Sequence, residues 1–402
     1  MLKSLALASA AVLAASSAHA AQIGDIFYIA MENHNWTQPA SVTGINQIKG
    51  NSAAPFINSL VTPGDPNATM VSYASNYVNV SLGLHPSEPN YVWQEAGVAG
   101  PLNDADPYNA MGVGTNVVSS PNLSGVLQAK GTSWKVYAED ADLATVGGNL
   151  TSTPAPSNQY AVPLKSFSGV SPTYTNAYNG SHQYNYAAKH VGQVFFTDTN
   201  GGDNLTPSNP EAKYYAPLQQ LSTDLTDNTV ARYNWITPDQ YNDMHSGLSG
   251  GFTYKGVTYT GDEALIAQGD NFLSQIVPQI EASQAFKNNG EIVIWNDETE
   301  ATTTTTAGFS SMEIIISPLA KGDAYTNDIA YTHSNDLATV QHLLGVQGAP
   351  LGGAAGAYTM SDLYKAGTVP EPATWAMLLL GFGGLGVAVR GVQRKLGAAV
   401  AG

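Results

Sequence analysis

Two pairs of polar residues follow two of the most apolar segments of the sequence. Glu32-Asn33 comes directly after residues 26–31, and Asp297-Glu298 comes after residues 292–296. Adjacent residues within a strand point to opposite faces, so a pair can converge on one ion only where its strand has ended. Three carboxylates and one amide oxygen are hard ligands that suit a divalent cation. The pairs predict a metal site, with solvated loop residues or helix caps as the alternative.

A serine with helix-start signals around it is the candidate nucleophile. The segment from His85 to Tyr91 reads HPSEPNY. Pro89 fits the first turn of a helix, because its missing N–H would be unpaired there anyway. Ser87 then lies at or beside the N-cap, where free backbone N–H groups and the helix dipole favour an anion. The alternative is an ordinary capping serine.

The elements that must position these residues belong to an α/β fold. Residues 26–31, 292–295 and 314–316 are continuous apolar runs, which are typical of strands buried on both faces of a parallel sheet. Apolar residues recur at helical spacing between residues 272 and 280. The pattern predicts an α/β sandwich with a mostly parallel sheet, whose carboxyl edge binds ligands.

The middle of the chain has a different character. Residues 98–130, 141–182 and 196–215 are rich in Gly, Asn, Ser, Thr, Pro and Tyr and show no clear period. We interpret them as long surface excursions on the sheet, with a small second lobe as the alternative.

Residues 1–20 have the pattern of a secretory signal. Lys3 gives a positive start, an apolar stretch follows, and Ala18-His19-Ala20 is a small-x-small cleavage site. We therefore expect export and a mature chain that starts near Ala21. A buried N-terminal helix is the alternative.

The other end resembles the PEP-CTERM sorting signal of Gram-negative bacteria. Val369-Pro370-Glu371-Pro372 precedes an apolar run over residues 375–389, and Arg390, Arg394 and Lys395 follow. The run is shorter than the ~20 residues that cross a bilayer comfortably. We expect a transient inner-membrane anchor with a cytoplasmic C-terminus, a sorting protease as partner, and final delivery to the cell surface or extracellular matrix. A permanent anchor is the alternative.

The charge balance excludes some partners. The sequence has 15 Lys and Arg against 31 Asp and Glu, and removing both end segments leaves 11 against 30, a net charge of −19. Such a surface repels nucleic acid and anionic membranes. An anionic substrate must therefore be attracted by something local, which again favours a metal ion. The sequence has no cysteine, which excludes disulfides and thiolate chemistry.

Six segments occur in a fixed order along the sequence. They are Met31-Glu32-Asn33-His34, the HPSEPNY segment, Pro238-Asp239 with Asp243-Met244-His245, Trp295-Asn296-Asp297-Glu298, Tyr331-Thr332-His333-Ser334 and Ser361-Asp362-Leu363-Tyr364. This series resembles the phosphoesterase family of bacterial acid phosphatases and phospholipases C, within the alkaline-phosphatase-like superfamily. The resemblance spans residues 24–365. It implies a catalytic domain over residues 21–366, followed by the sorting tail at 367–395, and an alkaline-phosphatase-like three-layer sandwich with long loop insertions.

The resemblance also implies roles for single residues. Glu32, Asn33, Asp297 and Glu298 would bind one divalent cation, calcium or a similar hard ion. Ser87 would be the nucleophile, and its oxygen would complete the metal shell. His245 and His333 would hold the phosphate or protonate the leaving group, and His190 is a further candidate for this work.

The implied reaction is phosphate-ester hydrolysis through a phosphoserine intermediate, as in acid phosphatases. The substrate would be a small molecule or a phospholipid head group. Two alternatives remain open at this point. One is a phosphodiesterase of the phospholipase C type, and the other is a non-catalytic surface protein that binds exopolysaccharide through its Tyr-, Asn- and Gly-rich loops.

We predict that the tail from Pro370 onward takes no part in catalysis. It follows the last domain segment, Ser361-Asp362-Leu363-Tyr364, after a short linker, and a domain that needed the apolar run for its core would not flank it with a proline pair and a basic cluster. A chain that ends at Gly367 should fold and hydrolyse esters like the full-length protein, as measured by circular dichroism and an activity assay. Intact peptides with Arg394-Lys395, found by mass spectrometry in protein released from the native host, would contradict the prediction.

Overall fold

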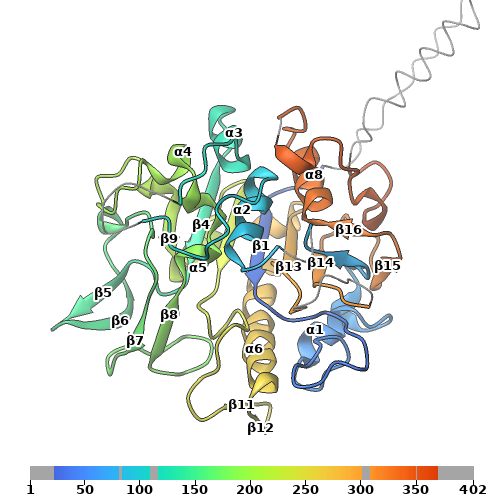
Figure 1. Cartoon of the computed structure of the whole chain (residues 1–402), viewed down its shortest axis with the longest axis horizontal. Helices are drawn as coiled ribbons and strands as arrows, with labels where there is room; N and C mark the ends of the chain where they lie inside the picture. The colour runs from blue at the N-terminus through green and yellow to red at the C-terminus, as the bar shows by residue number, and fades with distance from the viewer. Residues whose placement is uncertain (1–21, 81–83, 109–115, 301–307, 350, 370–402) are drawn as a thin grey trace, which may run out of the picture.

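An eight-stranded sheet forms the centre of the computed structural model, which describes residues 22–80, 84–108, 116–300, 308–349 and 351–369. Only β14 is antiparallel to its neighbours, so seven strands share one direction. The predicted mostly parallel sheet is confirmed (Figure 1). The order across the sheet is β15 (Tyr325–Asn327), β2 (Val71–Ala74), β14 (Glu313–Ile316), β13 (Glu291–Asn296), β1 (Ile26–Met31), β10 (Tyr233–Thr237), β4 (Trp134–Ala138) and β9 (Tyr215–Pro217).

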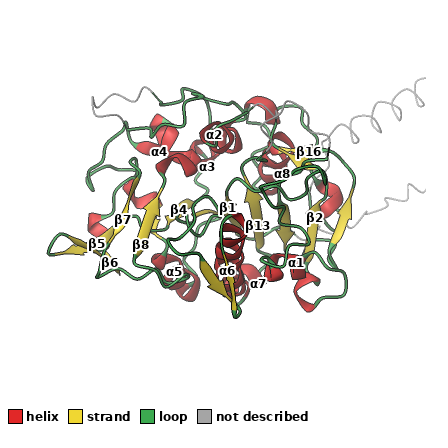
Figure 2. Cartoon of the chain, turned by 60° about the horizontal axis from the view of Figure 1, so that its bottom comes forward, coloured by secondary structure: helices red, strands yellow, loops and turns green. Residues whose placement is uncertain are grey.

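Helices cover both faces of the sheet, as Figure 2 shows. In β1, Ile26, Tyr28 and Ala30 belong to one hydrophobic core, and the alternate residues belong to the other. This is the two-residue period of a strand that is buried on both faces. The first core includes residues of α2 (Glu88–Ala96), α3 (Leu123–Ala129) and α8 (His333–Leu343); the second includes residues of α1 (Pro55–Leu60), α5 (Gln219–Asp227), α6 (Asp262–Glu281) and α7 (Gln284–Lys287). The three-layer α/β sandwich is thus confirmed.

Helix α6 is longer than its apolar pattern predicts, because its first half buries polar side chains. The Gln268 amide hydrogen-bonds the backbone of the preceding loop at Tyr241, Ser246 and Leu248. Asp270 accepts hydrogen bonds from two backbone N–H groups at the start of α1. Buried polar residues with such partners interrupt an apolar period without ending the helix.

The excursions predicted between residues 98 and 215 contain more regular structure than expected. Residues 215–217 form the edge strand β9, which pairs with β4. Only residue 215 of this strand falls within a predicted excursion, and a strand of three residues is too short to show a period. The other short elements lie outside the main sheet. They are α4 (Thr197–Asn200) and the pairs β5 (Leu143–Val146) with β6 (Asn149–Pro154), β7 (Phe167–Val170) with β8 (Gln183–Tyr186), β11 (Phe252–Tyr254) with β12 (Val257–Tyr259), and β3 (Tyr77–Val78) with β16 (Tyr331–Thr332).

Short 3-10 helices connect several of these elements. They are η1 (Pro66–Ala68), η2 (Ser157–Gln159), η3 (Ala188–His190), η4 (Gly192–Phe195), η5 (Ala212–Tyr214), η6 (Gly352–Ala354) and η7 (Ser361–Leu363).

The signal at residues 1–20 and the apolar run at 375–389 lie outside the described residues. Within the described ranges, no helix combines the length and the apolar character needed to cross a membrane.

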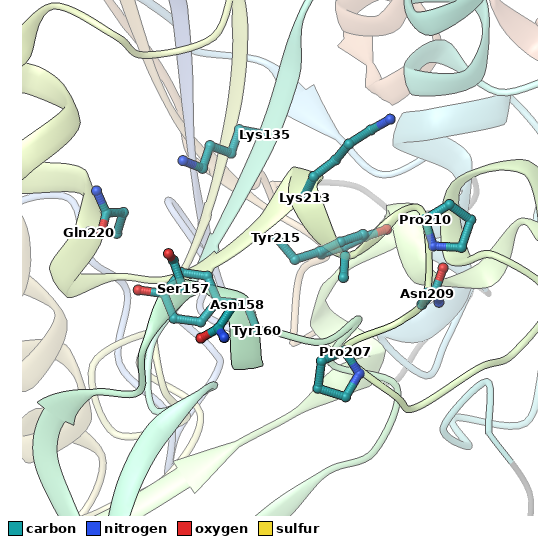
Figure 3. Close-up of a pocket in the computed structure, with 11 residues that line it drawn as sticks. Lys135, Ser157, Asn158, Tyr160, Pro207, Asn209, Pro210, Lys213, Tyr215 and Gln220 are labelled. Carbon is teal, nitrogen blue, oxygen red and sulfur yellow. The ribbon is translucent and has the colours of Figure 1, made fainter.

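A surface cavity of about 490 Å³ opens beside β4 and β9. Figure 3 shows Lys135 and Gln220 at one end of it and Asn209 and Pro210 at the other. None of the predicted site residues lines this cavity. The predicted site residues lie outside this cavity, at the carboxyl ends of the strands.

Three buried acids away from the predicted site make the stability of the fold depend on pH. Burial raises the pKa of Glu291 to about 8, and it raises the pKa values of Glu95 and Asp336 to about 7. A carboxyl with a higher pKa in the folded state than in the unfolded state binds more protons when folded. Between the two pKa values, the free energy of unfolding therefore falls as pH rises.

We predict that the protein is less stable at pH 8 than at pH 5, and that Glu291→Gln reduces this difference. Glutamine resembles the protonated acid but does not titrate. The variant therefore loses a contribution to the pH dependence of the free energy of unfolding that reaches about 1.4 kcal/mol per pH unit. Urea unfolding at both pH values measures the effect. Glu263→Gln is the control, because Glu263 is exposed at the start of α6. If the free energy of unfolding of Glu291→Gln differed between the two pH values as much as that of the wild type, the prediction would be refuted.

Candidate active site

The two polar pairs lie side by side, because their strands are neighbours. In the parallel pairing of β1 with β13, Met31 is opposite Asn296, so both strands end together. The Asn33 backbone N–H donates to Asp297 Oδ1 at 3.2 Å. The structure thus brings together the residues that the sequence analysis placed in one cluster.

Ser87 completes this cluster from the start of α2. It occupies the N-cap position, as predicted, but its side chain does not cap the helix. Its Oγ donates instead toward Glu32 Oε2 at 3.0 Å and Asn33 Oδ1 at 3.3 Å. A capping serine would accept a hydrogen bond from the first turn, so the ordinary structural role does not explain this hydroxyl.

Oxygen atoms converge around the amide of Asn33. In the structure its oxygen occupies a position 2.9 Å from Glu32 Oε2, 3.0 Å from Glu298 Oε1 and 3.3 Å from Ser87 Oγ. Rotation of the amide by half a turn would let its nitrogen donate to all three atoms. With the nitrogen inward the amide satisfies these acceptors itself, and with the oxygen inward it could serve as a ligand of a shared cation.

The cluster concentrates buried negative charge. Glu32 and Asp297 are fully buried, and Glu298 and Asp243 are nearly so. Burial, followed by the charges of Asp297, Asp243 and Glu298, raises the pKa of Glu32 well above its usual range. Burial and the charge of Glu298 do the same for Asp297, whose Oδ2 has no hydrogen-bond partner among the described residues. Buried charges of one sign are costly unless a counter-charge joins them, so this donor set fits a divalent cation.

His190 lies inside the cluster. Its Nε2 is 3.1 Å from Glu32 Oε1, and its Nδ1 is 3.1 Å from Asp243 Oδ2. The ring stacks on Tyr91 of α2 with the centroids 5.1 Å apart. Burial and the charge of Lys189 lower the pKa of His190 well below its ordinary value. A neutral imidazole held between two carboxyl groups orients them.

His245 is the more exposed of the neighbouring histidines. Its ring centroid is 5.7 Å from that of His190, and its Nδ1 lies 3.2 Å from Ser246 Oγ. Burial and the charge of Lys189 lower its pKa to about 4. Met244 before it has a φ of +85°, a strained value for a residue with a side chain. This turn presents Asp243 and His245 to the cluster.

His333 faces the core and not the open side. Its Nε2 contacts the carbonyl oxygen of Asp297 at 2.5 Å, and its Nδ1 contacts Tyr77 Oη at 2.6 Å. A carbonyl only accepts, so Nε2 carries the proton and the Tyr77 hydroxyl donates to Nδ1. Trp295 Nε1 in turn donates to Tyr77 Oη at 2.9 Å. The chain of hydrogen bonds fixes the backbone of Asp297.

Several residues at the site had no role in the sequence analysis. His85 Nδ1 lies 2.6 Å from Glu298 Oε2, to which the Asn90 amide also donates at 3.0 Å. Lys189 pairs with Asp104 at 2.5 Å. Asp243 and His190 are 53 residues apart in sequence, so no local spacing could have joined them. His85 and Asn90 belong to the HPSEPNY segment, so this motif is the sequence signal from which they could have been found.

Comparisons with solved structures give matches of low identity. One is a protein in the alkaline phosphatase superfamily from Vibrio parahaemolyticus, at 11% identity, with coverage of 81% of this chain and 67% of that chain and a TM-score of 0.44. Another is the lipoteichoic acid synthase LtaP from Listeria monocytogenes, at 10% identity, with coverage of 85% and 75% and a TM-score of 0.44. The comparison with curated proteins gives no match.

Family models match most of the chain. The model described as the Phosphoesterase family matches residues 73–347, which contain Ser87, Asp297 and Glu298 but not Glu32 and Asn33. The PEP-CTERM protein-sorting motif matches residues 368–395 and indicates export and membrane-associated sorting in a Gram-negative bacterium. With a serine beside a carboxylate cluster at the expected sheet edge, and a family match over more than half of its length, the chain belongs to the Phosphoesterase family and is a hydrolase of ester bonds.

Proposed function

We propose that the protein hydrolyses phosphate monoesters, in the manner of acid phosphatases, with Ser87 as the nucleophile. The observation that carries the proposal is the Ser87 hydroxyl. It stands at the start of α2, does not cap that helix, and points at Glu32 and Asn33. The partial positive charge at the helix N-terminus favours a phosphate group beside this oxygen.

The residues that would hold the cation are Glu32, Asn33, Asp297 and Glu298, with Ser87 beside them. When bound, a divalent cation supplies stabilisation of negative charge on phosphate oxygens. Carboxylate and amide oxygens are hard ligands, so the donor set supports calcium or a similar hard ion.

The protein's own residues would perform the proton and phosphoryl transfers. Ser87 Oγ attacks phosphorus and loses its proton to Glu32 Oε2, which accepts its hydrogen bond. The bond from phosphorus to the ester oxygen breaks, and the departing alkoxide takes a proton from His245, which is partly exposed and regains its proton from solvent. Water then attacks the phosphoserine and restores the hydroxyl, with inorganic phosphate as the second product.

The histidines divide this work by their positions. His245 is partly exposed, and we assign to it the contact with phosphate or the protonation of the leaving group. His190 and His333 are buried, with their ring nitrogens facing Glu32 and Asp243 or bound to Tyr77 and Asp297. We assign them as positioning residues, which replaces the substrate contact or proton transfer expected for His333 and His190 from sequence.

The proposal extends to processing and location. We propose a signal peptide over residues 1–20, a catalytic domain over 21–366, and a transient membrane anchor in the tail that a sorting protease removes. The sorting motif supports this route. Delivery to the cell surface would bring the enzyme to extracellular phosphate esters.

We predict that Ser87→Ala lowers monoester hydrolysis to less than about a tenth of the wild-type rate, with a stability change below the ~1 kcal/mol typical of a lost cap. Ser283→Ala is the matched control. Ser283 is the N-cap of α7 and accepts a hydrogen bond from Phe286 N at 3.1 Å, so its loss should lower stability and leave activity intact. Steady-state kinetics with mono- and diester substrates, together with urea unfolding, test both variants. Substantial turnover by Ser87→Ala would exclude the nucleophile, and a preference for diesters would favour the phospholipase C type.

We predict that dialysis against a chelator abolishes hydrolysis and that a hard divalent cation, tested as Ca²⁺, Mg²⁺ and Mn²⁺, restores it. The double variant Asp297→Asn, Glu298→Gln should not recover with any of the three ions, because two of the proposed ligands have lost their charge. Activity and elemental analysis of the same samples measure the effect. Full activity in protein that holds less than about a tenth of an ion per chain would remove the cation from the proposal.

A further inference from the structure

A second group of metal-ligating side chains lies near the first and shares no residue with it. It consists of His34, Asp262 and Glu300, whose ligand atoms all lie within 4.8 Å of one another. His34 is in the turn after β1, Asp262 begins α6, and Glu300 is two residues beyond Glu298. Three distant parts of the chain thus converge on one point.

The imidazole of His34 is buried beside carboxyl groups, with Asp262 as its ion-pair partner. Its side chain is 1% exposed, and its Nε2 lies 3.4 Å from Asp262 Oδ1. Within the described ranges, neither ring nitrogen makes a hydrogen bond of acceptable geometry. The same holds for the buried Oε2 of Glu300. Buried polar atoms are usually paired, so these atoms point to an absent ligand.

The groups around the site hold it in place. Asp262 Oδ2 accepts a hydrogen bond from the Asn46 backbone N–H at 2.6 Å, which leaves its other oxygen directed at His34. The backbone N–H of Glu300 donates to Asn35 Oδ1 at 2.9 Å. The Asn296 amide donates to the carbonyl oxygen of His34 at 3.3 Å. Because such bonds already fix these side chains, they lose little conformational entropy when an ion binds.

We propose that His34, Asp262 and Glu300 bind a second divalent cation, of the zinc type, with water in the remaining positions. One imidazole nitrogen and two carboxylates are donors that suit Zn²⁺ better than Mg²⁺ or calcium. Asp262 is 18% exposed and gives solvent access to the site. The cation would neutralise the two carboxylates.

The position of the site gives it a structural role. It joins the segment that contains Glu32 and Asn33 to the segment that contains Asp297 and Glu298, and it ties both to the start of α6. A bound ion would therefore stabilise the two loops that carry the first cluster. This inference does not depend on the proposed reaction, because the residues involved differ.

The test uses the mature protein with Asp297→Asn and Glu298→Gln, in which the first cluster has lost two of its four carboxylates. After chelation, calorimetric titration with Zn²⁺ should give one ion per chain, and Co²⁺ should give a visible spectrum typical of nitrogen coordination. Zinc should also raise the melting temperature. Adding His34→Gln should abolish all three signals. Adding His182→Gln, at an exposed histidine, should leave them unchanged.

Glu300→Gln is the second variant, which guards against loss of folding in His34→Gln. It should weaken zinc binding by at least about tenfold while circular dichroism stays unchanged. Fewer than about half a zinc ion per chain in the parent double variant would overturn the proposal. His34 would then be a protonated partner of the two carboxylates. Undiminished zinc binding after His34→Gln or Glu300→Gln would overturn it equally.

Discussion

The accumulation of buried carboxylates at one edge of the sheet is the constraint on which the site depends. Glu32, Asp297, Glu298 and Asp243 lie within one cluster, with exposed fractions of 0–4%. Like charges so placed repel one another and resist burial, as their raised pKa values show. Burying these like charges costs free energy at a few positions. The side chains around these positions are held in place by packing and hydrogen bonds. A site of this kind is a high-energy arrangement that a counter-ion stabilises.

The surrounding structure holds the cluster through aromatic and hydrogen-bond contacts. Tyr91 of α2 stacks on His190 and packs edge to face on Trp295 of β13, with centroids 5.3 Å apart. Trp295 also supports Tyr77 and, through it, His333. The helix that presents Ser87 is therefore packed against the side chains that orient Glu32 and Asp297. Loss of one of these rings would disturb the geometry of several ligands at once.

Export and the absence of cysteine are compatible with this architecture. The chain cannot use disulfides, so its long connections must be held by other means. The Tyr174 hydroxyl donates to Asp140 at 2.5 Å, and the Asn242 amide donates to both oxygens of Glu139 at 2.8 and 3.0 Å. The first of these bonds holds the excursion that contains Tyr174 to the end of β4, and the second pair joins the loops that follow β4 and β10. The proposed zinc site would add a metal cross-link near β1.

The sequence by itself determined three central strands, β1, β13 and β14, together with the helix start and the two polar pairs. Continuous apolar runs and the Ser-x-Pro signal are local patterns, and parallel strands bring their carboxyl ends to one edge, so residues 32–33, 87 and 297–298 could be expected to meet. Only the tertiary structure decided the partners of the histidines. His190 joins Glu32 and Asp243, and His333 turns its ring into the core, because side-chain direction depends on packing by residues far away in the chain. The same reason hid the group of His34, Asp262 and Glu300, whose members lie up to 266 positions apart, between residues 34 and 300. The edge strand β9 escaped prediction because three residues are too few to show a period.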